Sequence, residues 1–260
     1  MLLKNNQMKL SIIILNYNSW KFLDQCLSSL AQFINNNEEE VVVIDNNSKD
    51  IALFDYQKKY PFIDLISLKQ NLGFAGANNM AVKRAKGEVL LFLNPDIIVS
   101  NNIFSVLIDA FTNYLNVGIF APKLVLPDGQ PQPWAYGRTI NKHQDRGPIG
   151  QEVDWVSGAA LAIRRSVFEK VGGFDEKFFM YFEDQDLCER VRKTGQQIII
   201  LPEQKVVHFG GQSLKTLQKR KELYYQSQNY YWRKKYGAFA SLLLRLIRWP
   251  YKSYILGAVK

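Results

Sequence analysis

The stretch VLLFLNPDIIVS (residues 89–100) begins as an uninterrupted apolar run and then places an amide, a proline and a carboxylate in succession. Three other apolar runs in the first hundred residues end in the same manner: KLSIIIL leads into Asn16-Tyr17-Asn18, EVVVI into Asp45, and IDLISL into KQNLGFAGANN. Runs this continuous are typical of strands that are covered on both faces, as in a parallel sheet.

The segments between these runs have helical patterns, over residues 19–33, 51–60 and 76–86. Alternation of strands and helices predicts a doubly wound α/β layer. In such sheets ligands bind beyond the carboxyl ends of the strands, where the polar clusters fall. Further along we expect a helix over residues 100–114, a long loop over 127–152 that resembles a binding lid, and a helix that starts near residue 183.

Composition places the chain among ordinary globular proteins, because 47% of its 260 residues are hydrophobic and 22% are charged. Two cysteines, Cys26 and Cys188, are too few for a disulfide framework and are expected to be reduced core thiols. The N-terminal segment has no apolar run long enough for a signal peptide or a spanning helix, which favours a cytoplasmic location.

Asp96 is a candidate metal ligand, because a hard cation takes one or two carboxylates and completes its shell with phosphate oxygens and water. Asn94 is a candidate for a sugar hydroxyl or a metal-bound water. An ordinary turn is the alternative for both residues. His208, at the end of the apolar run KVVHF, is either a polar strand terminus or a further ligand of the same metal.

Two further clusters are suited to nucleotide binding. Asp45 can accept hydrogen bonds from a ribose or a base N–H, and the alternative is an Asx-turn that closes the strand. In NLGFAGANN, Gly73 and Gly76 precede a helix, whose N-terminus attracts phosphate. The segment contains neither a Walker loop nor G-x-G-x-x-G.

The segment FFMYFEDQDLCER sets Glu183, Asp184 and Asp186 directly after five aromatic or Met residues. Acids at a helix start are stabilised by its dipole, so capping is one interpretation. Three acids beside so much apolar surface exceed what capping needs, and Asp184 is our candidate general base.

Seven motifs in order resemble a family 2 glycosyltransferase of the rhamnosyltransferase-like branch. They are SIIILNYN, VVVIDNNSKD, NLGFAGANN, LFLNPD, WVSGAALAIRR, GGFDEKFFMYFEDQDLCERVRKTG and VVHFGG. The resemblance implies the α/β GT-A fold, a Rossmann-like and mostly parallel sheet flanked by helices. It implies a catalytic domain over residues 1–212, with a nucleotide-binding half at about 8–98 and an acceptor and base half at about 99–212.

The resemblance also implies roles for individual residues. The loop Asn16-Tyr17-Asn18 and Asp45 would hold the nucleoside, and Asn71, Gly73 and Asn78 would line the diphosphate and the sugar. Asn94-Pro95-Asp96 stands where the family has its Asp-x-Asp motif, so Asp96 would bind Mg²⁺ or Mn²⁺, with His208 as a further ligand. Asp184 would be the base, and the acceptor side would be shaped by Trp155, Ser157, Gly158 and Glu183. Asn94 replaces the first Asp of the strict motif.

The net charge of +9 belongs to the C-terminal segment, since residues 213–260 hold eleven Lys/Arg and one acid. Aromatic residues are interleaved with these cations, and Arg245 and Arg248 are spaced for one helical face. This pattern predicts a basic amphipathic helical tail at an anionic membrane interface, too short and too charged to span. Packing on the catalytic body or on another subunit, as in a homodimer, is the alternative. Nucleic-acid binding is disfavoured because the body has no basic groove.

Together these features predict a metal-dependent inverting glycosyltransferase at the inner face of the cell membrane. It would move a sugar, first choice rhamnose from dTDP-rhamnose and otherwise the sugar of a UDP-sugar, to a glycan or lipid-linked acceptor in bacterial surface polysaccharide synthesis. A non-catalytic nucleotide-sugar-binding or scaffolding homologue is the alternative. A nucleotidyltransferase would need a basic Gly-rich loop after the first strand, and Asn16-Tyr17-Asn18 does not provide one.

Overall fold

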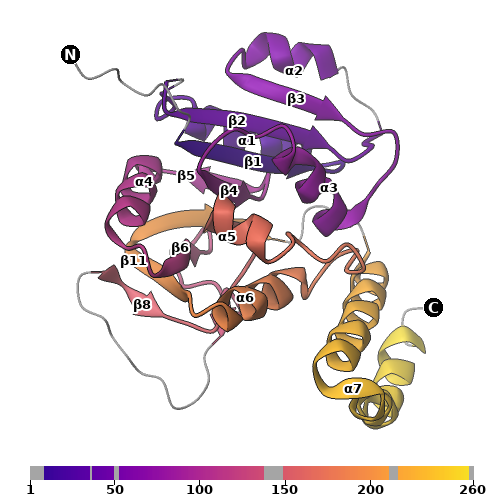
Figure 1. The fold of residues 1–260 in the computed structure, drawn as a ribbon. Coiled ribbons are helices and arrows are strands. Elements are labelled where there is room, and N and C mark those ends of the chain that lie inside the picture. Colours follow the sequence, from indigo (N-terminus) through magenta and orange to yellow (C-terminus); the bar gives the residue numbers. More distant parts are fainter. Residues whose placement is uncertain (1–8, 36, 50–52, 138–148, 211–215, 258–260) are drawn as a thin grey trace.

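One large sheet forms the centre of the protein in a computed structural model, which describes residues 9–35, 37–49, 53–137, 149–210 and 216–257 (Figure 1). The first half of the sheet contains four strands, β1 (Leu10–Asn16), β2 (Glu39–Asp45), β3 (Ile63–Ser67) and β4 (Val89–Leu93). They lie in the order β3-β2-β1-β4 and all run parallel, as the continuous apolar runs predicted. The α/β fold class is therefore confirmed.

The second half of the sheet is mixed. It contains β5 (Ile97–Val99), β6 (Val117–Val125), β8 (Gln151–Glu152), β10 (Ala160–Arg164) and β11 (Gln197–His208). Strand β10 runs antiparallel to both β4 and β6, and β11 is parallel to β6 but antiparallel to β5 and β8. The description "mostly parallel" holds for the first four strands and not for this half, because a buried apolar run reads the same in either direction. Two short strands, β7 (Tyr136–Gly137) and β9 (Trp155–Val156), form a separate pair.

Helices cover both faces of the sheet. They are α1 (Trp20–Leu30), α2 (Leu53–Lys59), α3 (Gly73–Val82), α4 (Ile103–Asn113), α5 (Arg165–Lys170) and α6 (Glu183–Lys193). A further helix, α7 (Leu217–Gly257), contributes no residue to either core of the sheet. Helices α1 and α4 pack in one core, and α3, α5 and α6 pack in the core of the opposite face. Helix α1 shows why: its buried residues Trp20, Leu23, Cys26, Leu27 and Leu30 recur at helical spacing and form one apolar stripe.

The prediction that Cys26 and Cys188 are reduced core thiols is confirmed, because both are free and buried. Burial raises the pKa of the Cys188 thiol to about 12, so this side chain behaves as a core residue and not as a nucleophile. Of the predicted long loop, residues 127–137 include a bridge between Val125 and Pro131 and the short strand β7. Residues 138–148 of that prediction lie outside the described residues.

Helix α7 is two helical arms joined at Gly237, whose backbone (φ 87°, ψ 174°) is essentially restricted to glycine. The second arm folds back along the first: Ser241 Oγ donates to the Asn229 carbonyl at 3.0 Å, and the Arg248 guanidinium lies 4.4 Å from the Tyr225 ring centre. Figure 1 shows this hairpin, in orange and yellow, beside the α/β body of the protein.

The first arm of α7 packs on the body. Tyr231 joins Phe178 and Phe182 in a small aromatic core, and Lys234 bridges Asp186 of α6 (2.6 Å) and Asp175 (2.7 Å). The prediction that α7 packs on the catalytic body therefore describes this arm. One detail of the membrane prediction is wrong. The Arg248 guanidinium donates to Gln228 and to Asn229 Oδ1 of the first arm, whereas Arg245 is exposed.

Candidate active site

Asp96 and His208 are brought together by strand pairing. Asp96 lies in the turn between β4 and β5, and His208 is the last residue of β11, where it pairs with Ile97 of β5. The backbone N–H of Phe209 donates to the Asp96 carbonyl at 3.1 Å, which fixes the two segments to each other. Two residues more than a hundred positions apart thus become neighbours with only 5% and 6% of their surfaces exposed.

The geometry of this pair fits a divalent cation. His208 Nε2 lies 3.2 Å from Asp96 Oδ1, and His208 Nδ1 lies 2.7 Å from Gln132 Oε1. When Nδ1 carries the proton and donates to Gln132, Nε2 presents a lone pair toward a carboxylate oxygen, an arrangement that a cation between them stabilises. Among the described residues no cluster of three or more His, Cys, Asp or Glu side chains could hold a metal. A cation here would complete its shell with water and phosphate oxygens, as Mg²⁺ does in nucleotide sites.

Asn94 lies beside the same pair. Its backbone N–H donates to the Ala159 carbonyl at 2.8 Å, and its side-chain Nδ2 lies 3.4 Å from His208 Nε2. Pro95 follows it and fixes the backbone that carries Asp96. Asn94-Pro95-Asp96 is therefore a turn that also brings Asn94 and Asp96 beside His208. The turn and the candidate cation site, given as alternatives above, do not exclude one another.

The Glu183-Asp184 pair starts helix α6 after two residues in the left-handed region, Tyr181 (φ 72°) and Phe182 (φ 67°). This conformation is strained for aromatic residues and is found mostly where surrounding structure enforces it. Phe182 packs with Tyr231 of α7 (ring centres 5.3 Å apart), so the first arm of α7 contributes to that enforcement. The turn directs two carboxyl groups into one cavity.

The two carboxyl groups differ in their partners. Asp184 Oδ2 accepts from the Gly158 N–H at 3.0 Å and Oδ1 accepts from the Gln185 N–H at 2.8 Å. Removal from water raises the pKa of Asp184, although these hydrogen bonds oppose the shift. Burial, reinforced by the Asp184 charge, raises the pKa of Glu183 well above its ordinary value. Of the two carboxyl groups, Asp184 is therefore the one that ionises more readily.

Asp186, the third acid of the segment, has a structural role. Its carboxylate pairs with Arg190 at 2.8 Å and with Lys234 at 2.6 Å, and it is 4% exposed. Sequence spacing does not separate it from Asp184, because both fall in the first turn of α6. What distinguishes the two acids is the ion pair between Asp186 and Lys234. Lys234 lies nearly fifty residues further along the chain, so the local sequence does not show this pair.

A cavity of about 710 Å³ unites most of the predicted site. Its lining includes every predicted metal, base and acceptor-side residue together with one donor-side residue: Asn94, Asp96, Trp155, Ser157, Gly158, Glu183, Asp184 and His208. It also includes Gln132 and three residues of α7 that sequence reasoning did not select, namely Arg220, Tyr224 and Gln228. These three residues are four positions apart and therefore lie on one face of α7. This spacing is the feature of the sequence that could have indicated a contribution of the tail to the site.

The remaining donor-side residues do not line this cavity, and four of them, Asn16, Tyr17, Asn18 and Asp45, lie at the carboxyl ends of β1 and β2. Asn16 and Asp45 pair in register, and Asn16 Nδ2 donates to Asp45 Oδ1 at 2.9 Å. Ser48 donates to both Asp45 oxygens, through its hydroxyl and its backbone N–H, so the Asx-turn interpretation of Asp45 describes its contacts. Asn18 Oδ1 accepts from the Lys49 N–H, which ties the loop that carries Tyr17 to the Asp45 loop.

The glycine-containing segment before α3 is held by amide side chains. Asn71 Oδ1 accepts from the Gly73 N–H and from Asn46 Nδ2, and Asn46, which sequence reasoning did not select, is 2% exposed. A Cβ on Gly73 (φ 73°) would lie 2.4 Å from the Phe179 carbonyl oxygen, so glycine is required there. Asn78 is 1% exposed and donates back to the Phe74 carbonyl, a contact within α3.

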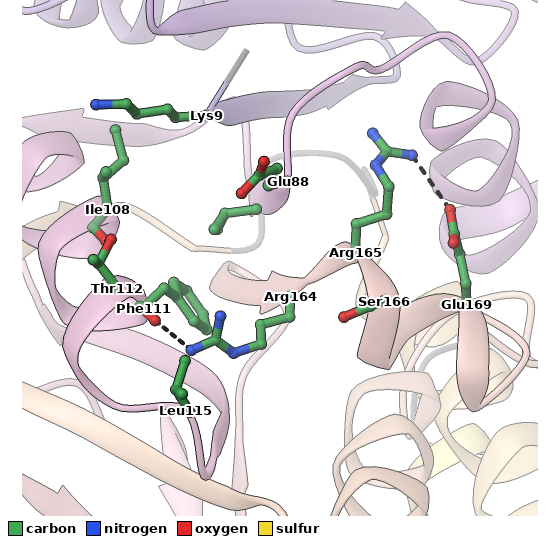
Figure 2. Close-up of a pocket in the computed structure, with 11 residues that line it drawn as sticks. Lys9, Glu88, Ile108, Phe111, Thr112, Leu115, Arg164, Arg165, Ser166 and Glu169 are labelled. Carbon is green, nitrogen blue, oxygen red and sulfur yellow. Dashed lines mark hydrogen bonds and ion pairs between the residues drawn. The ribbon is translucent and has the colours of Figure 1, made fainter. Parts of the chain in front are cut away.

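A second cavity of about 700 Å³ lies at the opposite ends of β1 and β4, next to Lys9 and Val89. Figure 2 shows that two arginines face it, and both are already bonded. Arg164 donates to the Tyr114 carbonyl at 3.0 Å and to the Phe111 carbonyl, which caps the C-terminus of α4. Arg165 donates to the Gly87 carbonyl at 2.7 Å and pairs with Glu169. These arginines join elements of the fold, and the cavity is not a candidate for the chemistry above.

Comparison with known families gives two matches, which together span residues 11–211. The model of the family described as "Glycosyl transferase family 2" matches residues 11–172, which include all of β1 but its first residue, the Asn94-Pro95-Asp96 turn and β10. This chain belongs to the family 2 glycosyltransferases. A second family model, "N-terminal domain of galactosyltransferase", matches residues 151–211 of this glycosyltransferase, the part that carries Asp184 and His208.

Among curated relatives, this glycosyltransferase is similar to rhamnosyltransferases. It is 27% identical over 238 residues to the N-acetylglucosaminyl-diphospho-decaprenol L-rhamnosyltransferase of Mycobacterium tuberculosis, covering 78% of this chain and 77% of the relative. It is 26% identical over 240 residues to the rhamnosyltransferase WbbL of Escherichia coli K12, covering 76% and 82%. The resemblance to the rhamnosyltransferase-like branch is thereby confirmed.

Among solved structures, the crystal structure of GalNAc-T7 with UDP, GalNAc and Mn²⁺ superposes with a TM-score of 0.66. At 17% identity this likeness shows a shared GT-A fold, over 79% of this chain and 44% of the larger protein. The GT-A prediction is confirmed. No helix in the described part of the chain is both long and apolar enough to cross a membrane.

Proposed function

We propose that this glycosyltransferase moves a sugar from a nucleotide diphosphate sugar to an acceptor hydroxyl with inversion at the anomeric carbon. The observation that carries the proposal is that Asp96 and Asp184, from distant parts of the chain, line one cavity. A cation site and a base on either side of a bound donor are what an in-line displacement requires. The relatives named above support rhamnose as the sugar and dTDP-rhamnose as the first choice of donor, with a UDP-sugar as its rival.

In the proposed reaction, Asp184 accepts the proton of the attacking hydroxyl while the new carbon–oxygen bond forms and the bond to the diphosphate breaks. The Gly158 and Gln185 N–H groups hold the carboxylate in place, and each oxygen keeps a lone pair for that proton. Mg²⁺ or Mn²⁺ bound by Asp96 and His208 would neutralise the charge of the departing diphosphate. Glu183, Trp155 and Ser157 form the acceptor side in this arrangement.

The donor-side assignments extend the proposal to the ends of β1 and β2. Asn16, Tyr17, Asn18 and Asp45 would hold the nucleoside there. Asn71 and Gly73, with Asn94 of the cavity, would lie along the diphosphate and sugar. Asn78 is the weakest of these assignments, because its amide already bonds within α3 and its surface is covered.

We also propose that the second arm of α7 lies on an anionic membrane. Its outer face carries a stripe of exposed apolar residues, defined here as the α7 stripe: Phe239, Leu242, Leu243, Leu246, Ile247 and Trp249. The C-terminal segment that bears it, residues 213–260, holds eleven Lys/Arg and one acid, and Arg245 is exposed beside the stripe. Such a charge suits an anionic lipid surface. Such a position would bring the cavity to a lipid-linked acceptor in polysaccharide synthesis at the cytoplasmic face. The alternative occupant is a second copy of the chain.

The test of the reaction is a thermal-shift screen of nucleotide diphosphates with and without Mn²⁺, followed by product analysis. A ligand that binds only the native state raises its melting temperature, so dTDP or UDP should stabilise the protein more strongly when Mn²⁺ is present. Nuclear magnetic resonance of the product should show the anomeric configuration opposite to that of the donor. Retention of configuration would contradict the base assignment, and stabilisation without any transfer would favour a non-catalytic binding protein.

A further inference from the structure

An aromatic groove of about 410 Å³ adjoins the catalytic cavity, between α6, the first arm of α7 and the β7–β9 pair. It is continuous with that cavity, because Trp134, Trp155, Phe182 and Gln185 line both. Four separate segments supply its aromatic side chains, which are Trp134, Tyr136, Trp155, Phe182, Tyr231, Trp232 and Tyr236. Three of the five tryptophans of the chain thus gather along one path that leads away from Asp184.

Trp134 has the most unusual setting of these residues. Its backbone lies in the left-handed region (φ 59°), and 88% of its surface is exposed. Both features cost free energy in the unliganded protein, because a bulky residue is strained in that region and a large apolar ring faces water. Among the described residues the non-glycine positions with positive φ are two asparagines, Trp134, Tyr181 and Phe182, and all three aromatic ones line the catalytic cavity.

Other aromatic rings of the groove, those of Trp155, Trp232 and Tyr236, are carried by β9 and α7. A Cβ on Gly137 would lie 1.9 Å from Trp155 Nε1, so this glycine lets the β7 backbone lie flat against the indole. Trp232 and Tyr236 lie one turn apart on α7 with ring centres 5.0 Å from each other, and Tyr236 remains 53% exposed. The groove therefore presents flat rings on rigid elements.

The charged groups of the groove neutralise one another. Asp154 pairs with Arg192 at 3.0 Å, and Glu189 pairs with Lys235 at 2.9 Å and with Lys193 at 3.0 Å. Although burial alone would raise it, bonds from Lys235 and Lys193 lower the pKa of Glu189 to about 2, so the carboxylate stays charged and paired. A groove with balanced charges favours a neutral ligand rich in hydroxyl groups over an anion.

We infer that this aromatic groove is a binding subsite for the glycan of the acceptor, and that it takes a neutral oligosaccharide of at least two sugars. Each sugar ring has an apolar C–H face that stacks on an aromatic ring, while its hydroxyls bond to the paired charges and to Gln185. The sugar that receives the new residue lies in the catalytic cavity, and the preceding sugars extend along Trp134, Trp232 and Tyr236. This inference rests on the proposed transferase function and adds the class and length of the acceptor.

The test uses the full chain labelled with 5-fluorotryptophan, in which five tryptophan signals report separately and are assigned by single substitutions. Linear glucose, N-acetylglucosamine, galactose and rhamnose oligosaccharides are titrated against their monosaccharides, without donor. We expect the Trp134 and Trp232 signals to move saturably with a tetrasaccharide of at least one series, and Trp20 and Trp249 to stay unchanged. Tyr236→Ala should weaken this binding about five- to tenfold, as loss of one stacking contact does.

Trp249→Ala is the matched control, since Trp249 is 70% exposed but lies on the α7 stripe outside the groove. It should bind the tetrasaccharide as the wild type does. The inference is overturned if no oligosaccharide moves the Trp134 and Trp232 signals, or if monosaccharides bind equally well. It is also overturned if only anionic vesicles, or only higher protein concentration, move them. Stabilisation by nucleotide, measured on the same samples, tests the transferase function separately.

Discussion

Glu183 and Asp184 are adjacent residues in the wall of one cavity, yet only Asp184 has both carboxylate oxygens bonded to backbone N–H groups. Oε2 of Glu183 is buried with no hydrogen-bond partner among the described residues. The difference separates their pKa values, because hydrogen bonds stabilise the charged form and burial alone opposes it. The charged form is therefore better stabilised at Asp184 than at Glu183.

The first prediction concerns Glu183→Gln. The raised folded-state pKa of Glu183 means that its contribution to stability is present below its ordinary value of 4.5 and is lost as pH rises through the folded pKa. Glutamine has no charge to bury, so the variant should melt higher than the wild type at about pH 8, by roughly 2–4 °C. The difference should vanish at about pH 4. Melting temperatures across pH measure it, and a variant that is less stable at every pH would contradict the assignment of a buried neutral Glu183.

The second prediction concerns the Asp96–His208 pair. Asp96→Asn should remove the part of the nucleotide-induced stabilisation that depends on Mn²⁺, because Asp96 supplies the anionic side chain of the proposed Asp96–His208 cation site. Gln132→Ala should raise the Mn²⁺ concentration needed for half of the thermal shift about tenfold. Gln132 contacts Nδ1 of His208, and residues that orient a metal ligand in this way affect its affinity for the metal. Thermal shift against Mn²⁺ concentration measures both effects.

Asp128→Asn is a suitable control for the same experiment, since Asp128 is exposed in a loop outside the cavity. It should leave the Mn²⁺ dependence at the wild-type value. If Asp96→Asn retained that dependence as well, the cation would have to bind elsewhere.

The third prediction concerns the α7 stripe. Leu246→Asp combined with Ile247→Asp should abolish co-sedimentation with anionic vesicles, because the two side chains are 62% and 71% exposed and would be the ones inserted into lipid. The melting temperature should stay near that of the wild type, since neither side chain is buried in the protein. Leu115→Asp, at a 74% exposed position on the catalytic body, is the matched control and should sediment normally. Loss of self-association in place of vesicle binding would assign the stripe to a homodimer.

The sequence predicted the parallel half of the sheet and the gathering of polar residues at its carboxyl edge, because both depend on local patterns. Apolar runs that end in Asn16, Asp45 and Asn94 mark strand ends without knowledge of their neighbours. The antiparallel insertion of β10 was not predictable in this way, since strand direction depends on the path of the whole chain.

Three features of the site depend on tertiary contacts and were missed for that reason. Asn46 reads as one amide among several, and only the folded loop shows that it holds Asn71. Asp186 reads like Asp184 until Lys234 of α7 is placed beside it. Arg248 reads as a cation for lipid head groups, but the turn at Gly237 folds it against Tyr225. Packing of the first arm of α7 on the body brings Arg220 and Tyr224 to the lining of the cavity, a role that composition alone could not assign.

The central claim is that Asp184 removes the proton of the acceptor hydroxyl, and Asp184→Asn tests it most directly. Asparagine keeps the size of the side chain and an oxygen for the Gly158 N–H but cannot take the proton. Sugar transfer and nucleotide binding are measured on the same preparation. We predict that transfer falls about 100- to 10,000-fold while the nucleotide-induced rise in melting temperature stays within error of the wild type. Transfer near the wild-type rate, or equal loss of transfer and nucleotide binding, would contradict the claim.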